Sequence, residues 1–217
     1  MINIPLDGQY QSDSLSISNQ LNINCYINIP QTQSFSQANL FGTAGIKEIS
    51  TTGLVRQQNR GSHIKNGKPY FVNGETLYRQ DLATVDGVEV FTNVSLGVIS
   101  GTNRVSMSDN GTQLMVLIPG GNGYIVNEAA SPVFQQIIDA DFTANGAPQY
   151  VVFVDSFFVV TTDSKKFIKS ASNDGLSWNA LDFGTAESDP DNIVAPIVSN
   201  NRLYIGGSEG TEEFQNT

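Results

Sequence analysis

Short apolar runs separated by polar turns recur along most of the chain. The runs are rich in Val, Ile, Phe, Tyr and Thr, and Asn-Gly, Gly-Gly and Asp-Ser pairs interrupt them, as expected for strands joined by tight turns. No long window repeats its apolar residues at helical spacing. Residues 131–142 come nearest, but their leading proline and adjacent isoleucines suit a strand as well. The pattern predicts an all-β protein.

The strands and turns form a repeat of about 45 residues. Four turn dipeptides mark the repeat at spacings of 44, 45 and 45 residues: Asn66-Gly67, Asn110-Gly111, Asp155-Ser156 and Asn200-Asn201. Each is followed by an apolar strand, a second turn, and a strand with an aromatic residue that closes the unit. These aromatic residues are Tyr78, Tyr124, Phe167 and Phe214. In three units an apolar strand also precedes the first turn, as a tight hairpin requires.

A period near 45 residues with several strands per unit is typical of β-propeller blades. One small twisted sheet cannot bury both faces alone, but it can do so against neighbours arranged radially. We therefore predict β-propeller-like repeats over residues 61–217, four of them visible. The fourth stops at Thr217 soon after its third strand. We expect an incomplete propeller, the first part of a longer polypeptide.

The first 60 residues lie outside the repeat. They are rich in Asn and Gln with single apolar residues at intervals, which predicts an extended N-terminal arm over residues 1–60. Two uses fit such an arm equally well: docking onto another molecule, or strapping the chain's own propeller. The apolar residues that we name as a candidate assembly interface are Tyr26, Ile29, Phe35, Leu40, Phe41 and Ile46.

Charge and the scarcity of metal ligands exclude several function classes. The net charge is −10, whereas a general phosphate-backbone binder needs a basic stripe. One cysteine and one histidine cannot form a zinc site of Cys and His or an intrachain disulfide. We expect His63 to be an ordinary surface histidine and Cys25 a half-buried thiol. No run approaches the roughly 20 apolar residues that cross a bilayer, so we expect a soluble chain without membrane insertion.

Two local motifs could carry chemistry, and both favour a structural interpretation. Residues 187–192, "ESDPDN", could contribute oxygen ligands to Ca²⁺, but they lack a full ligand loop and suit a solvated acidic loop better. The segment "SNDGLSW" matches the short Asp-box pattern of a fold-stabilising hairpin. In it Asp174 can bond turn amides, Gly175 can supply a left-handed backbone and Trp178 can plug the blade. We predict no catalytic residue, no metal and no cofactor.

The same Asp-box pattern also occurs in sialidases. Its members here are Ser172, Asp174, Gly175 and Trp178. A sialidase would in addition need an arginine cluster and a Tyr-Glu nucleophile pair. No Tyr-Glu pair stands out in the sequence. The arginines are scattered along the chain, at Arg56, Arg60, Arg79, Arg104 and Arg202. The motif therefore predicts a structural hairpin.

Several segments together resemble one known family. They are "CYINIPQTQ", "LFGTAGIKEI", "ETLYRQD", "RVSMSDNGTQLMVLI", "SNDGLSW" with "ESDPD" after it, and "RLYIGGSEGTEEFQNT". In this order they are similar to the N-terminal half of the tail hub proteins of short-tailed bacteriophages, also called packaged-DNA stabilisation proteins and related to tail nozzle proteins. Members of that family are longer, so the later propeller strands and the tip region have no counterpart here.

The resemblance implies a structural virion protein with no catalytic residue. It implies a homohexameric ring below the portal-adaptor ring that extends the DNA channel, retains the packaged genome and conducts it at ejection. The implied partners are the adaptor ring, a distal needle or tailspikes, and DNA in transit without sequence-specific contacts. The implied location is the phage tail, after assembly in the host cytoplasm. Nine acidic residues between Asp139 and Asp191 suit a channel, because like charge keeps a duplex from sticking.

Two other functions stay open at this point. One is a carbohydrate-binding or glycan-cleaving propeller, for which the Asp-box hairpin is the motive. The other is a cellular propeller scaffold for protein partners. Propellers serve all three roles, so the sequence separates them poorly.

Overall fold

The computed structural model describes residues 25–28, 39–43, 45, 47–187 and 192–215. The chain divides into two units, residues 1–48 and residues 49–217. The described part of the first unit contains one antiparallel pair, β1 (Cys25–Asn28) and β2 (Asn39–Gly42). The first strand of the repeat, β3, begins at Asn59. The division at residue 60 into an assembly arm and propeller blades stays a prediction.

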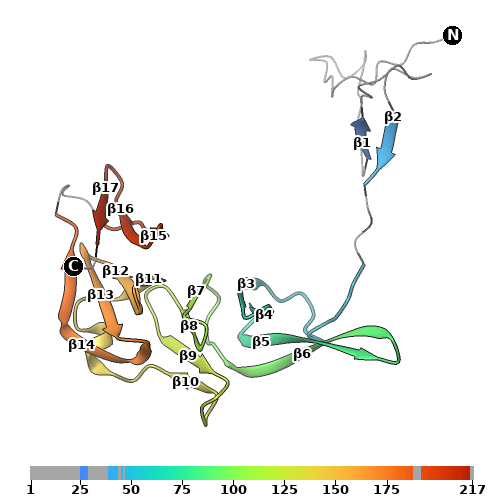
Figure 1. The fold of residues 1–217 in the computed structure, drawn as a ribbon, viewed down its shortest axis with the longest axis horizontal. Helices are drawn as coiled ribbons and strands as arrows, with labels where there is room; N and C mark the ends of the chain where they lie inside the picture. The colour runs from blue at the N-terminus through green and yellow to red at the C-terminus, as the bar shows by residue number, and fades with distance from the viewer. Residues whose placement is uncertain (1–24, 29–38, 44, 46, 188–191, 216–217) are drawn as a thin grey trace. The chain divides into compact units, whose positions relative to one another are not determined.

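The second unit consists of antiparallel sheets that follow one another along the chain (Figure 1). The first sheet contains β3 (Asn59–Lys65), β4 (Lys68–Asn73), β5 (Thr76–Val85) and β6 (Val88–Val98). The second contains β7 (Ser106–Asp109), β8 (Gln113–Leu117), β9 (Gly123–Asn127) and β10 (Phe134–Gln136). The third contains β11 (Pro148–Val154), β12 (Phe157–Thr162), β13 (Lys166–Ala171) and β14 (Asp174–Thr185). The fourth contains β15 (Ala195–Ser199), β16 (Arg202–Gly206) and β17 (Thr211–Phe214).

Every sheet is a meander in which strands adjacent in sequence are adjacent in space. The first strands of successive sheets contact one another, β3 with β7, β7 with β11 and β11 with β15. This arrangement of consecutive meanders is that of propeller blades, and the all-β prediction is confirmed. The ambiguous segment 131–142 forms the short strand β10 and part of a 3₁₀ helix, η1 (Ala140–Thr143).

The four predicted turn dipeptides all lie between the first and second strands of a sheet. In the first, third and fourth sheets both turn residues have positive φ, for example 50° at Asn66 and 75° at Gly67. Such turns match the right-handed twist of the flanking strands. The second sheet differs, because its loop is one residue longer and of its turn pair only Gly111 has positive φ, at 84°.

The prediction that the aromatic third strand closes each unit was wrong. The aromatic residues do lie on the third strands β5, β9, β13 and β17, but a fourth strand follows in the first three sheets. Strand β3 was also missed. These outer or polar strands lack a continuous apolar run: β10 has three residues, and β14 alternates between buried and exposed positions.

The core lies between the sheets. Strand β8 shows this best, since its neighbouring residues are fully buried against opposite partners. Leu114 and Val116 join a cluster with the first sheet, whereas Met115 and Leu117 join a cluster with the third sheet. A third cluster joins the third and fourth sheets. Burial of each such side chain contributes about 1.5–3 kcal/mol to the stability of the fold. The stacking of sheets thus provides the apolar burial that one sheet alone could not.

Candidate assembly surfaces

Polar side chains join the first and second sheets next to their hairpin turns. The side-chain amide of Asn66 donates to the carbonyl of Gly111 at 2.6 Å, and Nζ of Lys65 donates to the carbonyl of Thr112 at 3.0 Å. Nε2 of His63 lies 2.6 Å from a carboxylate oxygen of Asp109. His63 is therefore a partly exposed histidine, as expected for a surface position, but it lies beside a carboxylate. The partner is 46 residues away in sequence, so local reading could not find it.

A second group of polar residues bridges the same two sheets through Glu128. Tyr70 Oη and Arg79 Nη1 both donate to Oε1 of Glu128 at 2.6 Å, and Arg79 also donates to both carboxylate oxygens of Asp81. The hydrogen bond from Tyr70 lowers the pKa of Glu128, and that from Arg79 lowers the pKa of Asp81. Conversely, Arg79 has a raised pKa because of its bond to Asp81.

This cluster contains the Tyr-Glu pair that the sequence did not reveal, together with one arginine. The surroundings of Tyr70 do not activate its hydroxyl as a nucleophile, because they favour the protonated form. Tyr70 is fully buried, and burial followed by its bond to Glu128 raises the pKa of its hydroxyl. A second arginine, Arg60, is buried and donates to the backbone carbonyls of Asn103 and Gly74. Arg79 thus joins the first two sheets, whereas Arg60 holds the β4–β5 turn and the loop that leads to the second sheet.

The Asp-box hairpin holds the second and third sheets together. The carboxylate of Asp174 accepts from the amide of Leu176 at 3.0 Å, and the indole N–H of Trp178 donates to the carbonyl of Gly175 at 2.9 Å. Trp178 is buried and packs on Phe142 at 4.8 Å between ring centroids. Ser172 is exposed at the hairpin turn. The bonds are those of a structural hairpin.

The expected role of Gly175 was wrong. The left-handed residue of this turn is Asn173, with φ of 55°, and Gly175 does not have positive φ. Gly175 is instead required for close approach, since a Cβ there would lie 2.5 Å from Cδ1 of Ile125 on the second sheet. Its amide also donates to the side chain of Gln113 at 2.8 Å, a cross-sheet contact that sequence reasoning missed.

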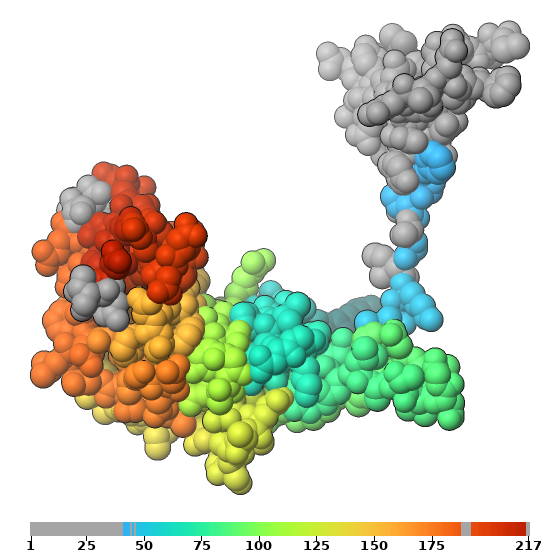
Figure 2. Space-filling model, viewed as in Figure 1, coloured from blue at the N-terminus to red at the C-terminus, as the bar shows by residue number. Residues whose placement is uncertain are grey.

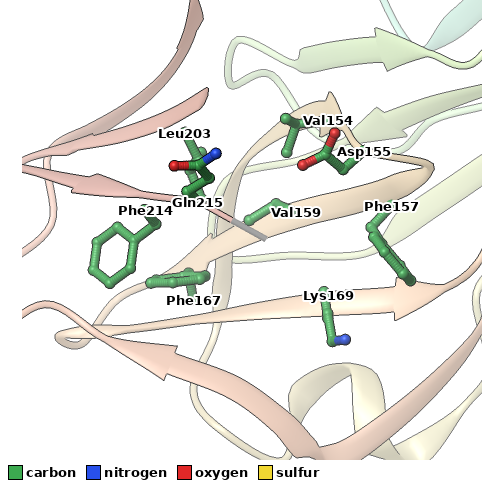
Figure 3. A pocket seen from close by; sticks show the side chains of 9 residues that line it. All are labelled: Val154, Asp155, Phe157, Val159, Phe167, Lys169, Leu203, Phe214 and Gln215. Carbon is green, nitrogen blue, oxygen red and sulfur yellow. The ribbon is translucent and has the colours of Figure 1, made fainter. Parts of the chain in front are cut away.

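Between the third and fourth sheets the packing leaves an apolar hollow of about 210 Å³ (Figure 3). Phe167 and Phe214 lie beside each other on one side of it, with ring centroids 4.8 Å apart in an edge arrangement. Near its rim the side-chain amide of Asn201 donates to the carboxylate of Asp155. The turn residues of these two sheets are thereby joined, as in the first and second sheets.

Several exposed apolar residues lie on the outer strands of the sheets. The tip of the β5–β6 hairpin exposes Leu82, Val85, Val88 and Val90, and it projects from the first sheet in Figure 2. In the third sheet, β14 exposes Leu181 and Phe183. In the first unit the backbones of Tyr26 and Phe41 are paired, and Leu40 lies in β2. Phe41 is 45% exposed, whereas Ile29, Phe35 and Ile46 lie outside the described residues.

Several predicted features concern ligands or membranes. Most of the acidic loop, residues 188–191, lies outside the described residues, as does the side chain of Cys25. Within the described ranges no group of three or more His, Cys, Asp or Glu is placed to hold a metal ion. Over the same part of the chain, no helix has the length and apolar character needed to cross a membrane.

The stacked meanders define a β-propeller protein. The hydrogen bonds between side chains of one sheet and residues of the next form the polar joints of this propeller. Residues 2–217 match the family model described as bacteriophage P22 Gp10, beta-propeller, a phage stabilisation family. The chain belongs to this family, which confirms the resemblance found in the sequence. No curated protein matches the sequence.

Solved structures with a similar arrangement are distant in sequence. BamB from Moraxella catarrhalis shares 13% identity at a TM-score of 0.47, over 72% of this chain and 44% of that one. Apo AztD from Citrobacter koseri shares 12% identity at 0.49, over 85% and 51%. Glutaminyl cyclase from Myxococcus xanthus shares 12% identity at 0.42, over 71% and 64%. The chain thus covers less than two thirds of each.

Proposed function

We propose that this protein is a structural subunit of a phage tail hub or nozzle. Copies of it would form a hexameric ring below the portal-adaptor ring, extend the DNA channel, retain the packaged genome and conduct it at ejection. A distal needle or tailspikes would attach to the same assembly. The observation that carries the proposal is the match of residues 2–217 to the phage stabilisation family.

The joints between sheets support a role as a channel wall. Each of the two middle sheets buries side chains against both neighbours, and side-chain hydrogen bonds connect successive sheets. A wall built this way resists bending because interiors are close-packed and transmit strain. No chemistry is needed for such a ring, since a heterologous interface repeated around an axis closes it.

The charge of the chain supports transient passage of DNA over binding. The net charge is −10, and affinity for duplex DNA comes mainly from lysine and arginine on phosphates. A negatively charged wall would repel the duplex and let it slide without sequence-specific contacts.

The N-terminal arm is the proposed docking segment, toward the adaptor ring or a neighbouring subunit. Its candidate contacts are Tyr26, Ile29, Phe35, Leu40, Phe41 and Ile46. Phe41 is a large aromatic residue with nearly half its surface exposed, and buried aromatic anchors dominate protein interfaces.

Electron-microscopy class averages of the native assembly test the ring directly. We expect a six-fold ring with a central opening, continuous with a portal-like disc. Isolated monomers at every concentration would contradict the proposal.

Deleting residues 1–48 tests the arm. The deletion ends before Ser50 and Thr52, whose side chains bond Asn93 and Asn73 in the first sheet, so the sheets keep these contacts. We expect the truncated chain to fold, with the circular-dichroism spectrum of a β-protein, but to lose ring assembly or adaptor docking. A truncated chain that assembles and docks like the full chain would remove the arm from the proposal.

A further inference from the structure

Five Asn-Gly pairs occur in the chain, and in such a pair the asparagine side chain can lose its amide without an enzyme. The backbone nitrogen of the glycine attacks Cγ of the asparagine, a C–N bond forms, and the bond from Cγ to the amide nitrogen breaks. Ammonia leaves with the glycine N–H proton, and water opens the resulting succinimide ring to aspartate or isoaspartate. Glycine favours the attack because it has no Cβ to hinder it. The pairs are Asn66-Gly67, Asn73-Gly74, Asn110-Gly111, Asn122-Gly123 and Asn145-Gly146.

Four of these pairs are restrained at the attacking nitrogen or by burial. The amide of Gly111 donates to the carboxylate of Asp109 at 2.8 Å, and the amides of Gly74 and Gly146 donate to backbone carbonyls at 2.9 Å and 3.3 Å. Such a nitrogen must give up its hydrogen bond before it can attack. Gly123 is a buried residue of β9, where strand pairing holds the backbone in place. The fold therefore disfavours the reaction at these four pairs.

The remaining pair, Asn66-Gly67, lies open at the turn of the β3–β4 hairpin. Both residues are exposed, and a Cβ added at Gly67 would meet no atom within 4 Å outside its chain neighbours. Within the described ranges, the Gly67 amide donates no hydrogen bond. In the same part of the chain, one hydrogen bond alone fixes the Asn66 side chain, from Nδ2 to the carbonyl of Gly111. Water and the attacking nitrogen therefore have the freest access at this pair.

The Asn66 side chain also joins the first and second sheets, so its conversion has a structural effect. The bond from Asn66 Nδ2 to the Gly111 carbonyl is 2.6 Å long. After conversion a carboxylate oxygen would face that carbonyl, and two acceptors repel each other. The new charge would lie one residue from Lys65, whose buried side chain donates from Nζ to the carbonyl of Thr112. Two of the side-chain bonds between these sheets are thereby affected.

Isoaspartate has a second effect, because its main chain runs through the former side-chain carbonyl and gains one carbon atom. The β3–β4 turn has two residues, with φ of 50° at Asn66 and 75° at Gly67. A turn of this length and type fixes the register of the strands that it joins. A longer main chain at Asn66 would therefore disturb the pairing of Lys65 with Lys68.

We propose that Asn66 is the site at which this protein deamidates spontaneously, with water as the only other reactant, and that the product weakens the contact between the first and second sheets. This inference goes beyond the proposed function and applies to the isolated chain. In a tail subunit, which is not resynthesised after assembly, the change would accumulate with the age of the particle.

Mass spectrometry of peptides from the aged full-length chain tests the site. The chain is kept in mildly alkaline buffer, which promotes loss of the glycine N–H proton, and samples are digested with chymotrypsin at intervals. The Asn66 peptide should gain the mass of amide-to-acid conversion roughly tenfold faster than the Asn110 peptide. The reason is that Asn110 Oδ1 accepts hydrogen bonds from the amides of Thr112 and Gln113, and its glycine amide is also engaged. In guanidinium chloride the five pairs should convert at similar rates, because the fold no longer protects any of them.

Two substitutions of Asn66 test the effect on the sheets. Asn66→Asp reproduces the charged product and should lower the equilibrium constant for folding by roughly fivefold. Asn122→Asp is the matched control, since it makes the same charge change at an exposed turn residue whose side chain has no hydrogen bond among the described residues. Asn66→Gly tolerates positive φ but has no amide to lose. Ageing should therefore lower the stability of the wild type, measured by urea unfolding, and leave that of Asn66→Gly unchanged.

The possible outcomes separate the two parts of this inference. Equal or faster conversion at any other Asn-Gly pair of the folded chain would overturn the site. An Asn66→Asp variant that unfolds like the wild type, or a loss of stability on ageing that Asn66→Gly shares, would overturn the effect on the sheets. All of these measurements use the isolated chain, so they leave the proposed ring to its own test.

Discussion

Strand β8 and the tip of the β5–β6 hairpin have similar apolar sequences but opposite surroundings. The residues "QLMVL" of β8 are all buried, with successive side chains in the clusters on either side of the second sheet. The residues 82–90, "LATVDGVEV", are all exposed. The same alternation of strand residues therefore has two outcomes: in β8 both faces pack between sheets, and in the hairpin tip the apolar side chains stay exposed.

A matched pair of leucines tests this comparison with the largest expected effect. Leu114→Ala removes a side chain that is fully buried between the first two sheets, and it should lower the free energy of unfolding by about 2–5 kcal/mol. Leu82→Ala in the hairpin should change it by less than about 0.5 kcal/mol. Urea unfolding of the full chain measures both. Equal effects would mean that the hairpin is part of the subunit core.

A smaller effect is expected from adding one methyl group at a joint. Gly175→Ala would place a Cβ 2.5 Å from Ile125 Cδ1, and overpacking of this kind costs about 1–3 kcal/mol. Ser177→Ala, on the same strand but exposed, is the control and should be nearly neutral. If Gly175→Ala unfolds at the wild-type urea concentration, the second and third sheets are not in close contact.

The smallest effect concerns the charged joint and depends on pH. The pKa of Glu128 is lowered in the folded protein, so its stabilisation is present above the ordinary carboxyl range near pH 4 and is lost as the pH falls through the lowered value. Glu128→Gln should therefore cost about 0.5–1 kcal/mol at pH 7, allowing for its partial exposure, and less at pH 3. Thermal unfolding at both pH values measures the difference.

The hairpin supplies the control for that experiment. Glu89 is exposed on the tip, so Glu89→Gln should leave the unfolding temperature of the isolated subunit unchanged at either pH. A cost at Glu128 that is as large at pH 3 as at pH 7 would show that the charge of this carboxylate is not what stabilises the contact between the two sheets.

The repeat and the fold class were predictable because their signals are local. Turn pairs such as Asn66-Gly67 indicate backbone with positive φ, and these pairs recur once in every sheet. The fourth strands were not predictable in the same way, since β6 and β14 mix exposed positions with buried or partly buried ones and lack continuous apolar runs. The αL residue of the Asp-box hairpin was misassigned because Asn173, like glycine, tolerates positive φ.

The joints were missed because their partners are far apart in sequence, yet a signal for them existed. Asn66 and Gly111 are 45 residues apart, as are Ser106 and Val151, and His63 and Asp109 are 46 apart. These separations are close to the repeat period of 44–45 residues, because equivalent positions on successive sheets are neighbours in space. Polar residues one period apart are thus candidates for cross-sheet bonds. Tyr70 and Glu128, 58 residues apart, do not follow this rule.

The same spacing has a consequence for how the chain opens. Bonds between equivalent positions couple each sheet only to its immediate neighbours, as in a one-dimensional array of repeats. Amide hydrogen exchange should then vary along the array, slowest in β8 and β12, which have a packed sheet on either side, and faster at the exposed tip of the β5–β6 hairpin. A pulling force applied to one sheet would therefore reach the other sheets only through the contacts between neighbours.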